Sequence, residues 1–264
     1  MVKSAERVAM LLKILSKNPG GLLFSDIEHA LSLPKSSLHA LLTTMSATAL
    51  VRYDADTNRY GLGPLVWELA TAFSQKLQLV PMALPHLEKL SDNLQETVQM
   101  AILDGSDIVY VAKSDSRHPV QLVSTVGSRL PAHATGLGKA LLACLAPHQL
   151  GRLYPSDSLP ALTTSTIQSV ATLASELETS RRRGYALDAE ECALGLYCLA
   201  MPVISAEHKA VAAISVSLPQ DRYRPHHVEN ILRQMTEETH RLSHKLGARN
   251  PECWRIAGRE GDVP

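Results

Sequence analysis

Two serines stand in an apolar stretch of the C-terminal half of the chain. Ser215 and Ser217 lie within the run 210–218, whose other members are all Ala, Val, Ile or Leu. Because alternate residues of a β-strand point to the same face, both hydroxyls lie on one face of the predicted strand. A buried hydroxyl is destabilising unless it is hydrogen bonded, so the pair either contacts a polar ligand or bonds to the backbone.

A second group of residues could receive an anion. Gly136 and Gly138 begin the apolar segment 136–146, which is predicted to be a helix. The first amides of a helix are free and lie at the positive end of its dipole, so they can bind a carboxylate without Lys or Arg. Asp188 could accept a hydrogen bond from a ligand hydroxyl or orient a polar neighbour. The alternative is that both glycines only allow close packing of the backbone.

Two enzyme motifs occur only in part. Gly138-Lys139 resembles a phosphate-binding loop, but that motif needs Gly where this chain has His133 and Ser or Thr where it has Ala140. The S-x-x-K match at 32–35 lacks the companion motifs of the enzymes that use it. The three acids Asp188, Glu190 and Glu191 have no evident nucleophile or metal beside them. The sequence therefore predicts no enzyme.

Metal-binding residues are not grouped with suitable spacing. The 4 cysteines stand at 144, 192, 198 and 253 without a C-x-x-C pair, and they are expected to be reduced thiols. Cys198 lies in an apolar strand without a cationic neighbour in sequence, which favours a buried, unreactive thiol. His240 and His244 lie one helical turn apart but have no third ligand nearby. No metal and no cofactor are expected.

The elements of the N-terminal region follow the order of a winged helix-turn-helix. Apolar spacing predicts helices over 4–16 and from 34 onward, and a capping box at Ser25 to Glu28 predicts a short helix between them. Turn residues 54–58 join two alternating segments, 51–53 and 59–62, into a hairpin. This order predicts a DNA-binding domain whose third helix enters the major groove.

The polar side chains of this region are candidates for DNA contact. On the third helix they are Lys35, Ser36, Ser37, His39, Thr43 and Thr44, and on the hairpin they are Arg52 and Arg59. Ser36, His39 and Thr43 are placed best for bases, while Lys35 and the hydroxyls near the helix start suit phosphates. The two arginines could meet phosphate or the minor groove. The alternative is a solvated polar face.

The charge of the whole chain is balanced, with 26 basic and 26 acidic residues. Residues 1–78 hold 8 basic and 6 acidic residues, a net of +2, and the rest of the chain carries −2. A DNA-binding domain of such low net charge makes few phosphate contacts, so we expect two or more copies of the chain to act together on DNA.

The remaining sequence predicts a mixed α and β domain. A helix over 64–78 leads to a boundary near Pro81 and Pro85. Beyond it we expect helices over 82–96, 136–146, 166–183 and 225–246 and strands over 98–103, 108–113, 121–125, 197–205 and 210–218. The expected organisation is α+β, with a DNA-binding domain and linker helix at 1–78, a second domain at 79–248 and a disordered tail at 249–264. No apolar run reaches the roughly 20 residues of a membrane span, so a cytoplasmic protein is expected.

Residues in both halves resemble the IclR family of transcriptional regulators. LPKSSLH at 33–39 and RYGLG at 59–63 are similar to the family's recognition helix and wing. HATGLGKA at 133–140, RGYALDAEE at 183–191, GLYCLAMPV at 195–203 and AISVS at 213–217 resemble its C-terminal domain. Many members place Arg after the His of the recognition helix, where this chain has Ala40. This difference removes a DNA contact that the resemblance implies, so the family's operator sequence and affinity are not carried over to this chain.

The resemblance implies a GAF-like effector domain, an antiparallel sheet with flanking helices, which assembles as a homodimer or homotetramer. Carried over by position, the effector contacts are the backbone at Gly136 and Leu137 and the side chains of Asp188, Cys198, Ser215 and Ser217. None of these is aromatic or Arg, which favours a small polar carboxylic acid.

We therefore expect a ligand-responsive regulator of a catabolic operon, with repression favoured over activation. Its partners are double-stranded operator DNA, a small effector and further copies of itself. The alternative is a small-molecule-binding module or enzyme whose N-terminal helices mediate protein contacts.

Overall fold

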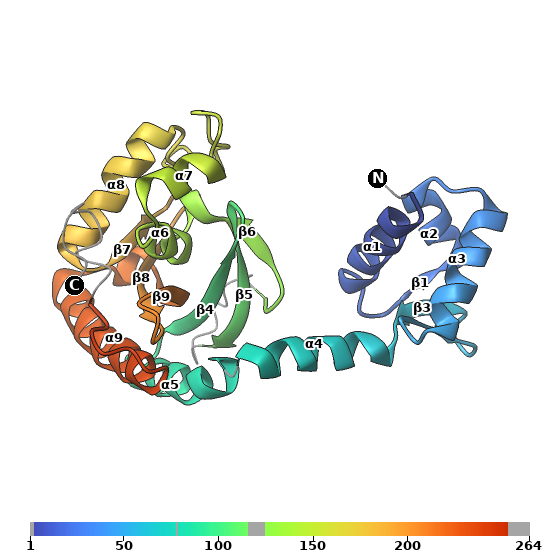
Figure 1. Ribbon diagram of the computed structural model, residues 1–264, viewed down its shortest axis with the longest axis horizontal. Helices are drawn as coiled ribbons and strands as arrows, with labels where there is room; N and C mark the ends of the chain where they lie inside the picture. The colour runs from blue at the N-terminus through green and yellow to red at the C-terminus, as the bar shows by residue number, and fades with distance from the viewer. Residues whose placement is uncertain (1–2, 78, 116–124, 253–264) are drawn as a thin grey trace. The chain divides into compact units, whose positions relative to one another are not determined.

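The chain divides into two units, Met1–Gln78 and Leu79–Pro264. The computed structural model in Figure 1 describes residues 3–77, 79–115 and 125–252. Helices and strands are labelled there in chain order. Each unit has its own apolar core, so each is described by itself.

The N-terminal unit packs three helices around a small core. They are α1 (Lys3–Ser16), α2 (Phe24–Leu31) and α3 (Lys35–Ala47). Leu11 and Leu15 of α1 meet Ile27 of α2 and Leu38 and Leu42 of α3, all of them buried. These contacts bury the apolar face that the helical spacing predicts on α1 and α3.

A three-stranded sheet completes this unit. The predicted hairpin is present as β2 (Val51–Asp54) and β3 (Arg59–Leu62), with Val51 opposite Leu62. The two-residue strand β1 (Leu22–Leu23), which the sequence did not predict, pairs with β3. Helix α4 (Pro64–Leu77) follows the wing. Fold class and winged helix-turn-helix order are confirmed.

The predicted start of the second helix is wrong. We expected Ser25 to cap it, but α2 begins at Phe24, and the Asp26 carboxylate accepts a hydrogen bond from the Leu23 N–H at 3.2 Å. An acidic side chain in the first turn thus satisfies an amide that has no partner within the helix. Ser25 lies inside the helix.

The C-terminal unit is built on a six-stranded antiparallel sheet of order β6-β5-β4-β9-β8-β7. The strands are β4 (Thr97–Asp104), β5 (Asp107–Ser114), β6 (Arg129–Pro131), β7 (Ala186–Ala189), β8 (Leu196–Ile204) and β9 (Ala210–Pro219). Of the strand predicted at 121–125, residues 121–124 lie outside the described residues. The tail predicted at 249–264 lies outside them from residue 253.

Helices cover both faces of this sheet (Figure 1). On one face lie α5 (Leu79–Leu94) and α9 (Pro225–Lys245), and on the other lie α6 (Gly136–Leu142), α7 (Pro147–Leu153) and α8 (Val170–Arg183). The strands alternate between the two: Ile214 and Val216 of β9 pack toward α5 and α9, whereas Ala213 packs on the α6 side. Ser215 and Ser217 share the side of Ala213.

Helix α5 begins earlier than expected. The prolines at 81 and 85 predicted a boundary, but Pro81 lies in the first turn, where its missing N–H removes no helical bond. Pro85 does lie inside the helix. The helix continues because its buried face, which includes Ala83, Leu87 and Leu90, packs on the sheet. Among the described residues, none of the helices is long and apolar enough to cross a membrane.

Candidate functional site

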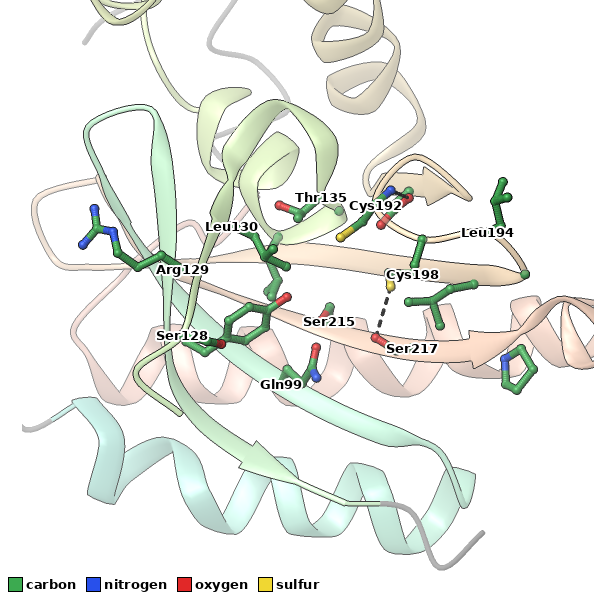
Figure 2. Close-up of a pocket in the computed structure, with 18 residues that line it drawn as sticks. Gln99, Ser128, Arg129, Leu130, Thr135, Cys192, Leu194, Cys198, Ser215 and Ser217 are labelled. Carbon is green, nitrogen blue, oxygen red and sulfur yellow. Dashed lines mark hydrogen bonds between the residues drawn. The ribbon is translucent and has the colours of Figure 1, made fainter. Parts of the chain in front are cut away.

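A cavity of about 500 Å³ opens between the sheet and the start of α6. Its lining comes from all six strands, from the loop after β7 and from the turn before α6 (Figure 2). The carried-over residues Gly136, Leu137, Asp188, Cys198, Ser215 and Ser217 all lie on its wall. Residues far apart in sequence are therefore brought to one site.

A row of polar side chains crosses the sheet at this cavity. Ser217 of β9 lies opposite Cys198 of β8, and Cys198 lies opposite Asp188 of β7. Cys198 Sγ and Ser217 Oγ are 3.1 Å apart, the contact drawn as a dashed line in Figure 2. Burial raises the pKa of the Cys198 thiol, which therefore stays protonated.

Ser215 lies two residues before Ser217 on β9, and the two hydroxyls differ in their hydrogen bonding. It is only 1% exposed, and its Oγ has no hydrogen-bond partner in the described residues. Gln99 of β4 stands directly opposite it and also lines the cavity. A buried hydroxyl without a partner is unfavourable, so the site is chemically incomplete without a polar group from elsewhere.

Asp188 is the acidic group of the wall. It is 1% exposed, and its Oδ1 accepts hydrogen bonds from the N–H groups of Glu191 at 2.8 Å and Cys192 at 3.3 Å. Burial raises its pKa to about 7, against the lowering effect of these amides and of Lys139. Asp188 thus titrates near neutral pH.

Behind Asp188 lies a buried ion pair. Lys139 of α6 is fully buried, and its Nζ contacts Glu191 Oε1. Glu191 Oε2 has no partner among the described residues. This ion pair joins α6 to the loop after β7, which forms part of the cavity wall.

The two glycines of α6 have packing roles. A Cβ on Gly138 would lie 2.1 Å from the Ala132 carbonyl oxygen, and one on Gly136 would lie 3.0 Å from that of Cys198. The Thr135 side chain caps the helix by accepting a hydrogen bond from the Gly138 N–H at 3.0 Å. Close packing therefore explains Gly138, while Gly136 both packs on β8 and lines the cavity.

The sequence missed several lining residues, among them Gln99, Tyr110, Arg129 and Leu194. Figure 2 shows the Arg129 guanidinium directed away from the polar row, and Asp104 binds it at 2.6 Å. The absence of an aromatic residue or Arg among the carried-over residues is therefore no guide to effector size. Gln99, a polar residue in a buried strand, was the signal available in the sequence.

In the N-terminal unit, the polar face of α3 is solvent accessible. Leu38, Leu42 and Met45 face the core, whereas the candidate DNA contacts Lys35, Ser36, His39, Thr43 and Thr44 are exposed and Ser37 is half-buried. Ala40 is exposed on the same helix. The Thr44 hydroxyl donates to the Ala40 carbonyl at 2.9 Å.

The two arginines of the wing, the hairpin of β2 and β3, differ in their exposure and hydrogen bonding. Arg52 is exposed, whereas the Arg59 guanidinium donates to the Gly21 carbonyl at 2.8 Å and so fastens the loop before β1 to β3. Arg59 therefore has a structural role. Hydrogen bonds from Thr57 and Asp56 hold the pKa of Asp54, in the hairpin turn, below its usual value.

The histidine pair of α9 does not form a common site. His244 Nδ1 lies 2.8 Å from the Ala248 carbonyl, and His240 Nε2 lies 3.8 Å from Glu252. Within the described part of the chain, no group of three or more His, Cys, Asp or Glu side chains could hold a metal ion.

Comparisons with known proteins agree for both units. The profile of the IclR helix-turn-helix domain matches residues 4–55, and that of the bacterial transcriptional regulator IclR C-terminal domain matches residues 71–244. The transcriptional repressor IclR of Escherichia coli (strain K12) is 34% identical over 223 residues, which cover 84% of this chain and 81% of that protein. The regulator XynR of the same strain is 31% identical over 247 residues, 94% of this chain and 98% of its own.

A solved structure is similar over both units. An IclR homologue from Microbacterium hydrocarbonoxydans, complexed with 4-hydroxybenzoate, matches with a TM-score of 0.82 at 25% identity. The match covers 92% of this chain and 99% of that protein.

Proposed function

This chain belongs to the IclR family of bacterial transcriptional regulators, and we propose that it represses a catabolic operon until a small carboxylic acid binds its C-terminal cavity. Transcription regulation and DNA binding are the function of the family. The repressed operon, the effector and the residues that bind it are the proposal. The proposed regulator acts on double-stranded DNA in the cytoplasm, and this function needs no catalytic step.

The observation that carries the effector proposal is the unpartnered Ser215 hydroxyl. It stands in a cavity of about 500 Å³, a size usual for small-molecule sites, beside the polar row of Ser217, Cys198 and Asp188. An effector oxygen would supply the missing hydrogen bond. The Gly136 and Leu137 amides open α6 on the same wall, where a carboxylate would meet the start of a helix.

The 4-hydroxybenzoate in the related structure supports a carboxylic acid for this chain. The cavity here has room for a ring of that size, and Tyr110 and Leu130 give it an apolar wall. Both small polar acids and aromatic acids therefore belong in the first screen.

For the operator, we propose that α3 reads the major groove with Ser36, His39 and Thr43, while Lys35, Ser37 and Thr44 contact phosphates. Arg52 and Arg59 on the wing are proposed for phosphate or the minor groove. The exposed polar face opposite Leu38 and Leu42 supports this assignment.

We also propose that the protein is a dimer or tetramer. Trp67 is 77% exposed and Leu69 is 56% exposed on α4, a large apolar area for a surface helix. A second copy of the chain would cover this apolar area and would bring a second DNA-binding domain to the operator.

The experiment is binding to the DNA upstream of the protein's own gene, at several salt concentrations and with a panel of carboxylic acids. We expect a sequence-preferring shift that weakens with salt and with one of the acids. No sequence-preferring shift under any condition would favour the alternative, a ligand-binding module or enzyme whose N-terminal helices bind protein.

A further inference from the structure

Among the buried charged groups at the cavity wall and directly behind it, carboxyl groups outnumber ammonium groups. Asp188 and Glu191 are two carboxyl groups, and Lys139 is the one ammonium paired with them among the described residues. Lys139 is already paired with Glu191, because its Nζ contacts Glu191 Oε1. Both hydrogen bonds that the described residues make to the Asp188 carboxyl reach Oδ1. Arg129 also lines the cavity, but it is paired with Asp104 and Asp107 and is directed away from the polar row (Figure 2). Among the described residues, no counterion therefore stands at the polar row for a further carboxylate.

Gly136 packs against Cys198, the middle residue of the polar row, so a carboxylate bound at the start of α6 also lies close to Asp188. Strands lie about 4.8 Å apart, so Cys198 is about one spacing from Asp188 and Ser217 about two. At such distances two like charges in a partly dry site repel enough to change an equilibrium about tenfold or more. When two carboxyl groups share a site, one of them is driven to hold a proton.

On the basis of the effector proposed above, we infer that a carboxylate binds this cavity together with one proton, which Asp188 takes up. The protonated carboxyl group no longer repels the effector, and its O–H can donate a short hydrogen bond to a carboxylate oxygen. Effector affinity should then fall as the pH rises.

The groups that face Asp188 leave it as the site of that proton. From α6 comes Lys139, from the loop after β7 come Glu191 and Cys192, from β8 comes Cys198, and from β5 comes Tyr110. Burial raises the pKa of Cys192 to about 11 and raises those of Cys198 and Tyr110 above their ordinary values, so all three are already protonated. Asp188, with a pKa of about 7, is ready to exchange a proton at neutral pH.

The test uses the full chain and calorimetric titration with 4-hydroxybenzoate, benzoate, lactate and succinate between pH 6 and 8.5. Each titration is repeated in phosphate and Tris, whose different ionisation enthalpies report the protons taken up. We expect about one proton per bound acid at pH 8.5 and about half a proton at pH 7. Affinity should change little below pH 7 and fall about 15-fold from pH 7 to 8.5.

Asp188→Asn gives an independent measurement. Asn keeps an oxygen for the two backbone amides and holds a permanent donor without charge, so its affinity for the acid should be the same at pH 6.5 and 8.5. The matched control is Glu190→Gln, because Glu190 binds the Gly195 N–H through Oε1 and does not line the cavity. That variant should keep the wild-type pH dependence.

The outcomes separate the two proposals. An acid that binds with pH-independent affinity and without proton uptake overturns the inference and leaves the proposed effector class standing. If Asp188→Asn keeps the wild-type pH dependence, the proton lies elsewhere and the inference is wrong. If none of the four acids binds at any pH, the carboxylic effector itself is rejected. The neutral analogue 4-hydroxybenzamide should bind without proton uptake.

Discussion

Ser217 contacts the thiol of Cys198 at 3.1 Å, whereas Ser215, two residues earlier on the same face of β9, has no partner for its hydroxyl among the described residues. Two identical side chains therefore contribute differently to stability. Ser217 already has a hydrogen bond in the protein, and Ser215 has one to gain.

Ser215→Ala should weaken effector binding about fivefold to tenfold without loss of stability. The substitution removes a buried hydroxyl that makes no hydrogen bond, so the free energy of unfolding should stay the same or rise by up to about 1 kcal/mol. Ser217→Ala should lose about 1 kcal/mol, because it breaks the contact to Cys198. Urea unfolding and titration with the acid found by screening give both numbers. A Ser215→Ala protein as destabilised as Ser217→Ala would contradict this reading.

Lys139→Met should destabilise the protein by about 3–5 kcal/mol. It leaves Glu191 buried without the ammonium that it contacts. The double variant Lys139→Met, Glu191→Met should recover part of this loss, since no charge is then left unpaired. Urea unfolding followed by circular dichroism measures the interaction energy of the pair. Additive losses would show that the two side chains do not stabilise each other.

The raised pKa of Asp188 predicts how stability depends on pH. The folded state holds this proton up to about pH 7, whereas the unfolded state releases it near its ordinary value of 3.8. The contribution of Asp188 to stability is therefore present at low pH and is lost as the pH rises from about 4 to 7, by up to about 4 kcal/mol. Asp188→Asn should unfold at a higher temperature than the wild type at pH 8 and at a similar one at pH 4. Thermal unfolding of Glu190→Gln is the control, and no difference between the two variants would refute the assignment.

Ala40→Arg should tighten operator binding. Ala40 is exposed on α3, the helix proposed to read the operator. One new phosphate contact per DNA-binding domain should steepen the slope of log affinity against log salt concentration by about one unit per protomer. Fluorescence anisotropy with labelled operator measures this slope. Ala47→Arg adds the same charge at the far end of α3 and should change the slope less. If both variants change the slope equally, the tighter binding comes from the added net charge and not from a contact at position 40.

Trp67→Ser should shift the protein toward monomers. The exposed indole and Leu69 are the proposed contact with a second copy, so the variant should sediment as a smaller species and bind operator at least tenfold more weakly. Leu162→Ser removes another exposed apolar side chain, in the C-terminal unit, and should leave both properties unchanged. Wild-type sedimentation and DNA binding in Trp67→Ser would exclude α4 as the interface.

The fold was predictable where the sequence signal is local. The turn residues around Asp54 and the alternation beside them locate the wing, and apolar spacing locates α1, α3 and α9. Strand β1 was missed because a two-residue strand depends on pairing with β3 rather than on its own sequence. The start of α2 was misplaced because Asp26, not Ser25, meets the free amide.

The candidate site was predictable in part for similar reasons. Strand alternation brings Ser215 and Ser217 to one face, and the family resemblance supplies Asp188. The pairing of Lys139 with Glu191 could not be foreseen, since 52 residues separate them and only the loop after β7 brings them together. Tyr110 lines the cavity through the register of β5, which a strand's own sequence does not reveal.

The alternation of β9 has a consequence for the divergence of sensors of this kind. Ile214 and Val216 belong to the core beneath α5 and α9, while Ser215 and Ser217, between and beside them, face the cavity. Under the proposed function, substitutions on the cavity face would change which effector is recognised while the neighbouring residues preserve the fold. New effector specificities can evolve, or be engineered, one hydroxyl or thiol at a time on a sheet that remains stable throughout.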